Sequence, residues 1–423
     1  MQLPHYPQYE SYRDSGVEWL GEVPQQWKTI RLKYVSQEQN QKVAASTVQD
    51  RYVGMENVES WSGRLVDTAS EVEGLANMFA GQDILFGKLR PYLAKVHLAE
   101  ISGICSSEFM VLRFGENVSK RFYFYTLISN AFIGLVNAST YGSKMPRANP
   151  GFVSNREIPV PPLEEQQTIA RFLDDKTDKI DRAVKIKEGQ IALLRERKQI
   201  IIQEAVTKGL NPDAPMKDSG IDWIGEIPAH WDVENPKWLF RHRKEKARKG
   251  EQQLAATQKY GVIPQQEYME LEGRRIVQVF LDFDILKHVE AGDFVMSMRS
   301  FQGGIEYSDY TGCVSSAYVA MEPGELIHAP YYKYLLKSPR FIEALQVTSN
   351  LVRDGQALRF DNFTMVTLPV VPLDEQRQIA AHIDDALAKS DRAIELKERQ
   401  IEALKEYKAT LINAAVTGKI KVI

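Results

Sequence analysis

The sequence predicts an α+β protein built as an internal repeat, in which two β-rich mixed domains are each followed by one long helix. Three observations lead to this prediction. A short tryptophan-containing motif occurs twice, a long helical segment occurs twice, and the stretches between them share a strand-rich plan but little sequence. A chain that repeats its scaffold and varies what the scaffold carries is expected to hold two readers of different targets.

Each half opens with the tryptophan motif, DSGVEWLGEVPQQW at 14–27 and DSGIDWIGEIPAHW at 218–231, with a constant offset of 204. We expect its four tryptophans to fill a core and Pro24 and Pro228 to mark a turn. The acidic residues between the tryptophans disfavour contact with phosphate. The motif is therefore interpreted as a packing element; its tryptophans are Trp19, Trp27, Trp223 and Trp231.

Short strand-like segments follow, separated by Gly, Ser and Asn turn signals. Those of the first half are RYVGMENV, DILFGKL, AKVHLAE and FMVLRFG, and those of the second are GRRIVQVFLDF, GDFVMSMRSF and SSAYVAMEP. An apolar stretch closes each half, at 121–139 and 331–349, and each is predicted to be one buried helix. The two interiors share few residues, among them the aligned Asp83 and Asp293.

The long helical segments run from Pro161 to Gly209 and from Val371 to Lys419, with a constant offset of 210. Proline and carboxylates at the start and glycine near the end are typical of helix boundaries. Seven of ten positions in a 4-3 stepping pattern are apolar in each copy, which indicates a coiled-coil seam. In the first copy these positions are 173, 177, 180, 184, 187, 191, 194, 198, 201 and 205.

Lysines interrupt both seams at equivalent positions, Lys187 and Lys198 in one copy and Lys397 and Lys408 in the other. A polar residue in a seam reduces stability and restricts pairing to one register. The nearest partner for each helix is the other copy. We therefore expect two helices of about 40 residues, roughly 60 Å long, packed on one another as an intramolecular coiled coil.

Composition and motifs exclude several classes of protein. The 423 residues are 43% hydrophobic and 26% charged, without an apolar run near 18 residues or a signal peptide, so a soluble, non-membrane protein is expected. Two cysteines favour a reducing cytoplasm and a buried role for each. There is no phosphate-binding loop, no metal-ligand spacing and no catalytic motif, so an enzyme is improbable.

Basic and aromatic residues gather in four presumed loops at equivalent places in the two halves: 87–95, 140–149, 297–304 and 352–360. Arg and Lys suit phosphates and guanine edges, and Gln suits adenine, so these loops are interpreted as nucleic-acid contacts. The overall net charge of −3 counts modestly against such binding, although local patches rather than the total make the contact. The basic run 237–249 is most simply a solvated helix face.

The sequence resembles the specificity (S) subunits of type I restriction–modification systems. The resemblance rests on PPLEEQQTIARFLDD and VPLDEQRQIAAHIDD, on QEAVTKGL and NAAVTGKI at the helix ends, and on the duplicated SGxxWxGExPxxW motif. It implies two target recognition domains separated by an antiparallel coiled coil, related by a pseudo-two-fold axis. Its implied boundaries are 14–162 and 218–372 for the recognition domains, 163–209 and 373–420 for the spacer helices, and 210–217 for the linker.

The resemblance also implies function, partners and cofactors. Each domain would read one half of an asymmetric bipartite site in double-stranded DNA, and the helix pair would set the spacer. Two methyltransferase (modification) subunits would dock and bring S-adenosylmethionine, and a restriction (translocase/nuclease) subunit using ATP and Mg can join them. The chain itself would hold no cofactor, metal or catalytic residue, and would serve DNA methylation and host defence in the cytoplasm.

The residues that we expect to contact DNA are chosen by chemistry and position within the four loops. They are Lys88, Arg90, Tyr92, Lys144 and Arg147 in the first domain, and Arg299, Gln302, Arg353, Gln356 and Arg359 in the second. Two other interpretations remain open: a recognition subunit of another restriction–modification class, and a coiled-coil adaptor that binds protein instead of DNA.

Overall fold

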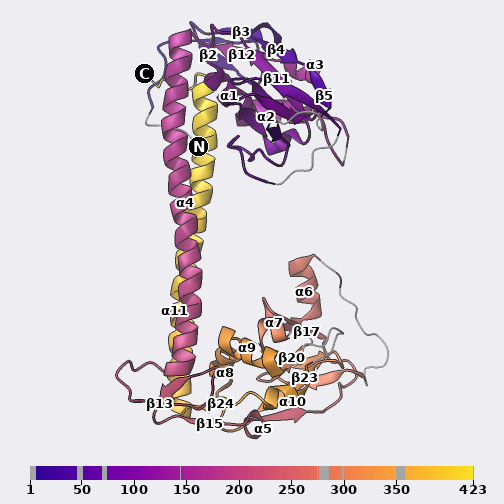
Figure 1. Cartoon of the computed structure of the whole chain (residues 1–423), viewed down its shortest axis with the longest axis vertical. Coiled ribbons are helices and arrows are strands. Elements are labelled where there is room, and N and C mark those ends of the chain that lie inside the picture. The colour runs from indigo at the N-terminus through magenta and orange to yellow at the C-terminus, as the bar shows by residue number, and fades with distance from the viewer. Residues whose placement is uncertain are drawn as a thin grey trace. The chain divides into compact units, whose positions relative to one another are not determined.

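The computed structural model describes residues 6–44, 51–68, 74–142, 144–273, 275, 285–297, 300–348 and 358–422. The chain forms two compact units. The first unit comprises residues 1–188 together with 398–423, and the second comprises residues 189–397. Each long helix contributes one half to each unit (Figure 1).

The two long helices are α4, Leu163–Lys208, and α11, Leu373–Val416. Both carry two acidic residues in the first turn, where the helix dipole favours negative charge. Gly209 and Gly418 follow the helix ends with φ of +73° in each case, the left-handed conformation expected of a residue after a helix. The two predicted long helices are confirmed, although α11 ends at Val416, short of the predicted 420.

The predicted seam is the buried face of both helices. Every one of its ten positions is buried or half-buried in α4, while neighbours such as Leu193 and Glu196 are exposed. In the first unit, Leu173 and Ile169 of α4 share a core with Leu411 and Ala415 of α11. In each unit the helices run antiparallel, because the residue numbers of contacting pairs rise along α4 as they fall along α11.

The four seam lysines each reach an acceptor on the opposite helix. In the first unit Lys187 donates to Gln400 Oε1 at 2.7 Å, and Lys408 donates to Asp181 Oδ1 at 2.8 Å. In the second unit Lys397 donates to Gln190 Oε1 at 2.6 Å, and Lys198 pairs with Asp391. The contacts of one unit become those of the other when 210 is added to or subtracted from each residue number. All four lysines find acceptors in this register, and that they restrict the pairing to it stays a prediction.

The first domain is built around two four-stranded sheets (Figure 1). One has the order β4-β11-β8-β9 and is antiparallel throughout, and the other has the order β5-β7-β10-β6. The strands are β1 Tyr12–Asp14, β2 Glu22–Pro24, β3 Lys28–Arg31, β4 Ser36–Gln39, β5 Lys42–Ala44, β6 Tyr52–Val53, β7 Leu75–Phe79, β8 Ile84–Gly87, β9 Val96–Leu98, β10 Gly103–Ser106, β11 Phe109–Phe114 and β12 Glu157–Val160. The short helices are η1 Leu32–Tyr34, η3 Pro91–Leu93, α1 Lys120–Ile128, α2 Asn130–Ala138 and α3 Pro150–Ser154.

The second domain repeats the antiparallel sheet, with the order β16-β23-β20-β21, whereas its other described strands pair as two-stranded sheets such as β17-β18 and β19-β22. Its strands are β13 Met216–Asp218, β14 Glu226–Pro228, β15 Asp232–Glu234, β16 Phe240–Arg243, β17 Leu254–Thr257, β18 Gly261–Pro264, β19 Lys287–Val289, β20 Phe294–Met296, β21 Glu306–Tyr307, β22 Gly312–Val314, β23 Val319–Pro323 and β24 Leu368–Val370. Its helices are α5 Pro236–Leu239, α6 Gln265–Glu272, α7 Ser300–Gly303, α8 Ala329–Leu335, α9 Pro339–Thr348 and α10 Phe360–Thr364. Most of the predicted strand GRRIVQVFLDF lies outside the described residues.

The prediction of one helix at 121–139 and one at 331–349 is wrong, because each stretch forms two helices. Between α1 and α2, Ser129 adopts an extended conformation and its side chain accepts a hydrogen bond from Phe132 N, which starts a new helix. Between α8 and α9 the break lies just before Pro339, because a proline ring disfavours the helical backbone conformation of the preceding residue.

The tryptophan motifs pack against the C-terminal ends of the long helices. Trp27 and Trp231 are fully buried, and Trp19 and Trp223 are half-buried with each indole N–H donating to a backbone carbonyl. A side chain on Gly418 would meet Pro24 and Trp27, and one on Gly209 would meet Trp231. The motif is thus a packing element, as predicted. None of the described helices has both the length and the apolar character needed to cross a membrane.

Candidate nucleic-acid interface

In the first domain, two of the predicted contact loops lie against each other. Arg90 N donates to Pro146 O at 2.7 Å, and Ala148 N donates to Lys88 O at 3.0 Å. A β-bridge joins Leu89 to Arg147. The loops 87–95 and 140–149 are far apart in sequence but lie against each other, which brings Lys88, Arg90 and Arg147 together.

The backbone of the first loop is held in an unusual conformation. Arg90 and Ala94, on either side of η3, have φ of +50° and +46°. A residue with a Cβ rarely occupies this left-handed region, at a cost of roughly 1–3 kcal/mol, and such residues cluster at functional sites. Hydrogen bonds from Arg90 N and from Ala94 N hold the turn in place. The loop is therefore preorganised to present Tyr92, which is exposed.

Arg147 is engaged within the protein. Its guanidinium makes a two-pronged ion pair with Glu108, with Nη2 2.8 Å and Nε 3.1 Å from Oε1. This hydrogen bond raises the pKa of Arg147 above its usual value. The pair ties the second loop to the segment that leads into β11, so Arg147 has a structural role whether or not it also contacts DNA.

Two exposed apolar side chains on this surface were missed by the sequence reasoning. Tyr141 and Met145 lie in the second loop beside the exposed Lys144 and are 63% and 49% exposed. Exposed aromatic and apolar groups next to cations suit contact with base faces and thymine methyl groups. Their position in a basic loop was a signal that could have identified them.

In the second domain the described residues include two of the five candidates. Gln302 is exposed on α7, and Arg359 is exposed immediately before α10. Arg299, Arg353 and Gln356 lie outside the described residues.

The aligned aspartates Asp83 and Asp293 have a structural role in both domains. Each is buried, accepts a backbone N–H from three residues earlier, and binds an arginine through two hydrogen bonds. Asp83 binds Arg113 of β11, whereas Asp293 binds Arg243 of β16. The prediction of a solvated helix face at 237–249 is wrong. The helix α5 ends at Leu239 and the chain continues as the strand β16, where Arg243 is buried and paired with Asp293.

Among the described residues, no group of three or more His, Cys, Asp or Glu side chains could hold a metal ion. Burial raises the pKa of Cys105 to about 12 and that of Cys313 to about 11, so both thiols stay protonated near neutral pH. They are buried free cysteines at equivalent places in the two domains, on β10 and β22, as predicted.

Known proteins resemble this chain in sequence. The family model described as "Type I restriction modification DNA specificity domain" matches residues 24–193 and 232–406. The MjaVIII type I restriction enzyme specificity subunit of Methanocaldococcus jannaschii is 27% identical over 76% of this chain and 75% of that protein. The putative MjaX specificity subunit of the same organism is 24% identical over 95% of this chain and 96% of its own length.

Solved structures share the fold. One, from work on complex assembly and conformational transition of the type I R-M system, aligns with a TM-score of 0.69 at 17% identity, covering 93% of this chain and 98% of that chain. The HsdS subunit from Thermoanaerobacter tengcongensis aligns with a TM-score of 0.55 at 17% identity, covering 94% and 98%.

Proposed function

The chain belongs to the family of type I restriction–modification DNA specificity domains, and from this premise we propose that its two domains read the two halves of one asymmetric DNA site. It is a specificity subunit, the non-catalytic component that gives a type I system its DNA sequence preference. The observation that carries the proposal is the family match to both halves of a chain whose halves differ in sequence.

We propose the recognition domains at residues 14–162 and 218–372, and spacer helices at 163–209 and 373–420 with the linker 210–217 between. The extents of α4 and α11 and the antiparallel contacts within each unit support these boundaries. The spacer between the half-sites would then follow from the length of the helix pair.

DNA contact in the first domain is assigned to the joined loops, through Lys88, Arg90, Tyr92, Lys144 and Arg147. Their convergence and the strained backbone at Arg90 support the assignment. In the second domain the proposed contacts are Arg299, Gln302, Arg353, Gln356 and Arg359. The exposure of Gln302 and Arg359 is consistent with this role.

The partners are double-stranded DNA and two methyltransferase subunits that carry S-adenosylmethionine. A restriction subunit using ATP and Mg would be a further partner where the system has one. These partners and a cytoplasmic location are supported by the family and by the two free cysteines.

The test is a genome-wide map of methylated adenines in cells that carry the intact system. An asymmetric bipartite motif is expected. Arg90→Ala should relax one base position of one half-site at a cost of about 1–3 kcal/mol, if Arg90 reads a base edge. Arg299→Ala should do the same in the other half-site.

Two comparison variants sharpen this test. Lys144→Ala should weaken methylation of all sites alike if Lys144 contacts only phosphate. Arg197→Ala, on an exposed position of α4 away from the loops, should change nothing. If Arg90→Ala and Arg299→Ala both leave the motif and its occupancy intact, the assignment of the loops is wrong; a single palindromic motif would contradict the two-reader proposal itself.

A further inference from the structure

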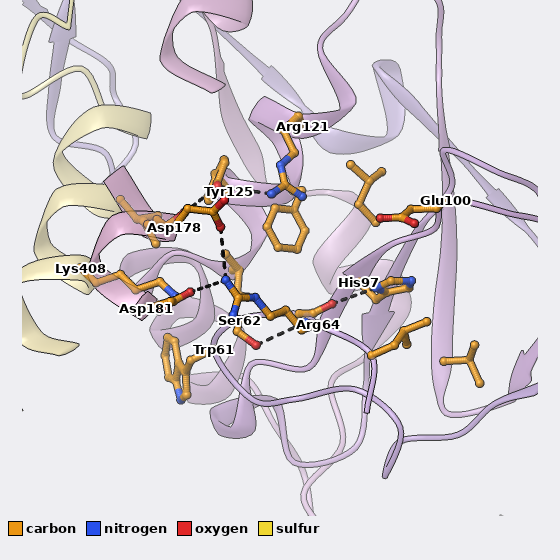
Figure 2. Close-up of a pocket in the computed structure, with 18 of the residues that line it drawn as sticks. Trp61, Ser62, Arg64, His97, Glu100, Arg121, Tyr125, Asp178, Asp181 and Lys408 are labelled. Carbon is orange, nitrogen blue, oxygen red and sulfur yellow. Dashed lines mark hydrogen bonds and ion pairs between the residues drawn. The ribbon is translucent and has the colours of Figure 1, made fainter. Parts of the chain in front are cut away.

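A segment of the first domain, Glu59–Arg64, reaches the long helices in the first unit (Figure 2). Its Arg64 Nη2 lies 2.8 Å from Asp181 Oδ2 and 3.3 Å from Asp178 Oδ1, both on α4. Asp181 also accepts a hydrogen bond from Lys408 of α11 at 2.8 Å. One carboxylate thus joins the recognition domain to both helices.

The domain holds this segment in a fixed conformation. Trp61 N donates to Ala94 O at 3.2 Å, and Glu59 N donates to Arg64 O at 2.8 Å. The ring nitrogen Nδ1 of His97 lies 2.8 Å from Gly63 O, and burial lowers the pKa of that histidine. Gly63 has φ of +68°, and a Cβ there would come within 2.1 Å of Val96 O. The backbone that carries Arg64 is therefore held in place by hydrogen bonds and close packing.

Cavities lie on both sides of the segment. One of about 570 Å³ is lined by Arg121, Phe124 and Thr177, and one of about 710 Å³ by Ile180, Val184 and Lys405. Both are open to solvent, and Arg64 is half exposed at 54% of its side chain. Salt screens such an exposed ion pair far more than a buried one. The Lys408–Asp181 pair, at 15% and 21% exposure, is better shielded.

The Arg64 ion pair is one of several contacts between a domain and its helices, and two of the others occur in equivalent form in both units. In both units a tyrosine of the domain donates to an aspartate of the helix, Tyr125 to Asp174 and Tyr334 to Asp384. In both, a glutamine at the helix start caps a domain segment, Gln166 in one and Gln376 in the other.

Arg64 has no counterpart among the described residues of the second unit. The position equivalent to Asp178 is Ala388. The position equivalent to Asp181 is Asp391, whose ion pair in that part of the chain is with Lys198.

We propose that Arg64 is a positioning residue that fastens the first recognition domain to the helix pair in a salt-sensitive way. When the pair is formed, it adds an attachment to the hydrophobic core that the domain shares with both helices; when salt or mutation breaks it, the domain can pivot about that core. Resting on the proposed function, this would make the spacing over which the first half-site is read depend on Arg64.

The direct test measures the angle without DNA. Nitroxide labels on cysteines introduced at two exposed positions, Glu116 of the first domain and Arg171 of α4, report the distance between domain and helix in the full chain. The native cysteines are buried and so compete little for the label. The parent should give a narrow distance distribution at low salt and a broader one at 1 M NaCl, whereas Arg64→Gln should be broad at both.

The control is Arg182→Gln, because Arg182 pairs with the same Asp178 at 3.8 Å from within α4 and does not belong to the domain. The distance distribution of Arg182→Gln should match that of the parent. Arg64→Lys should restore part of the narrow distribution. Asp178→Asn should broaden the distribution less than Arg64→Gln does, because Asp181 remains to pair with Arg64. A narrow, salt-independent distribution in Arg64→Gln would overturn the proposal.

A second measurement connects the attachment to DNA. In cells, Arg64→Gln should increase methylation of sites whose spacer is one base pair too long or too short, relative to the correct site, without changing either half-site. Unchanged spacer selectivity together with a broadened distance distribution would overturn the functional part. If the parent methylates no bipartite site, the proposed function fails while the distance measurement still decides the role of Arg64.

Discussion

At the scale of single residues, the same position carries different contacts in the two copies. Glu165 at the start of α4 accepts a hydrogen bond from Tyr9, whereas the equivalent Glu375 of α11 accepts from the Trp231 indole and lies 2.8 Å from His230 Nε2. Asp83 and Asp293 likewise take arginines from different strands. The duplicated residue is kept as an acceptor while its donor differs.

The glycines after the helices give a prediction at this scale. Gly418→Ala would place a Cβ 2.3 Å from Pro24 Cδ and 3.2 Å from Trp27 Cη2 at a φ of +73°. Backbone strain and overpacking together should lower the free energy of unfolding by about 2–4 kcal/mol. Thermal or urea unfolding of the full chain measures this.

Two other glycines serve as controls for that variant. Gly209→Ala should cost less, because its Cβ would come no closer than 2.9 Å to Glu375 Oε1 and 3.3 Å to Trp231, whereas that of Gly418→Ala meets Pro24 at 2.3 Å. Gly189→Ala, inside α4 with no atom within 4 Å of its Cβ, should stabilise by up to about 1 kcal/mol through helix propensity. Equal losses at all three positions would show that the tryptophan motif does not pack specifically against the helix end.

At the scale of elements, the seam lysines limit how the helices pair. Lys187 and Lys397 each place a charge in a mostly apolar seam and reach a neutral glutamine on the opposite helix. Replacing a seam position by an apolar residue removes the need to satisfy that charge, so stability should rise while the preference for one register falls. The lysines are best understood as determinants of specificity.

The double variant Lys187→Leu with Lys397→Leu tests this interpretation. We expect a melting temperature above that of the parent, together with oligomers in size-exclusion chromatography with light scattering, because the apolar seam can pair in other registers or with other chains. Lys185→Leu, an exposed position outside the seam, should do neither. A less stable and purely monomeric double variant would assign the lysines a stabilising role.

The long helices could be predicted because their signals are local and repeated: a period, a start and an end. The break at Ser129 could not be read from apolar content, since a side-chain cap decides it. The first-domain loops were predicted to contact DNA, but their contact with each other was not predicted. Nor was the ion pair between Arg147 and Glu108, because a contact across 39 positions of sequence leaves no local signal.

At the scale of the whole molecule, the proposed spacing function depends on the length of two helices at once. Adding one heptad at Gly189 and one at the equivalent Arg399 keeps the seam continuous in both copies. Seven helical residues add about 10.5 Å, which corresponds to about three base pairs at 3.4 Å each. Methylome sequencing should find a wider spacer, by up to about this amount, between unchanged half-sites.

An insertion in α4 alone is the matched control, because it shifts Lys198 away from Asp391 and should abolish methylation by breaking the register. Altered half-site sequences in the doubly extended chain, or an unchanged spacer, would reject the idea that the helices act as a ruler.

The seam contacts have a consequence for how such a chain is put together. Lys187 meets Gln400, the counterpart of Gln190, and Lys408 meets Asp181, the counterpart of Asp391. Each helix therefore carries both the donors and the acceptors that its partner needs, so the interface is isologous in its chemistry. Nothing in these contacts favours an unlike partner over an identical one; it is the covalent joining of the two copies that brings two dissimilar readers together.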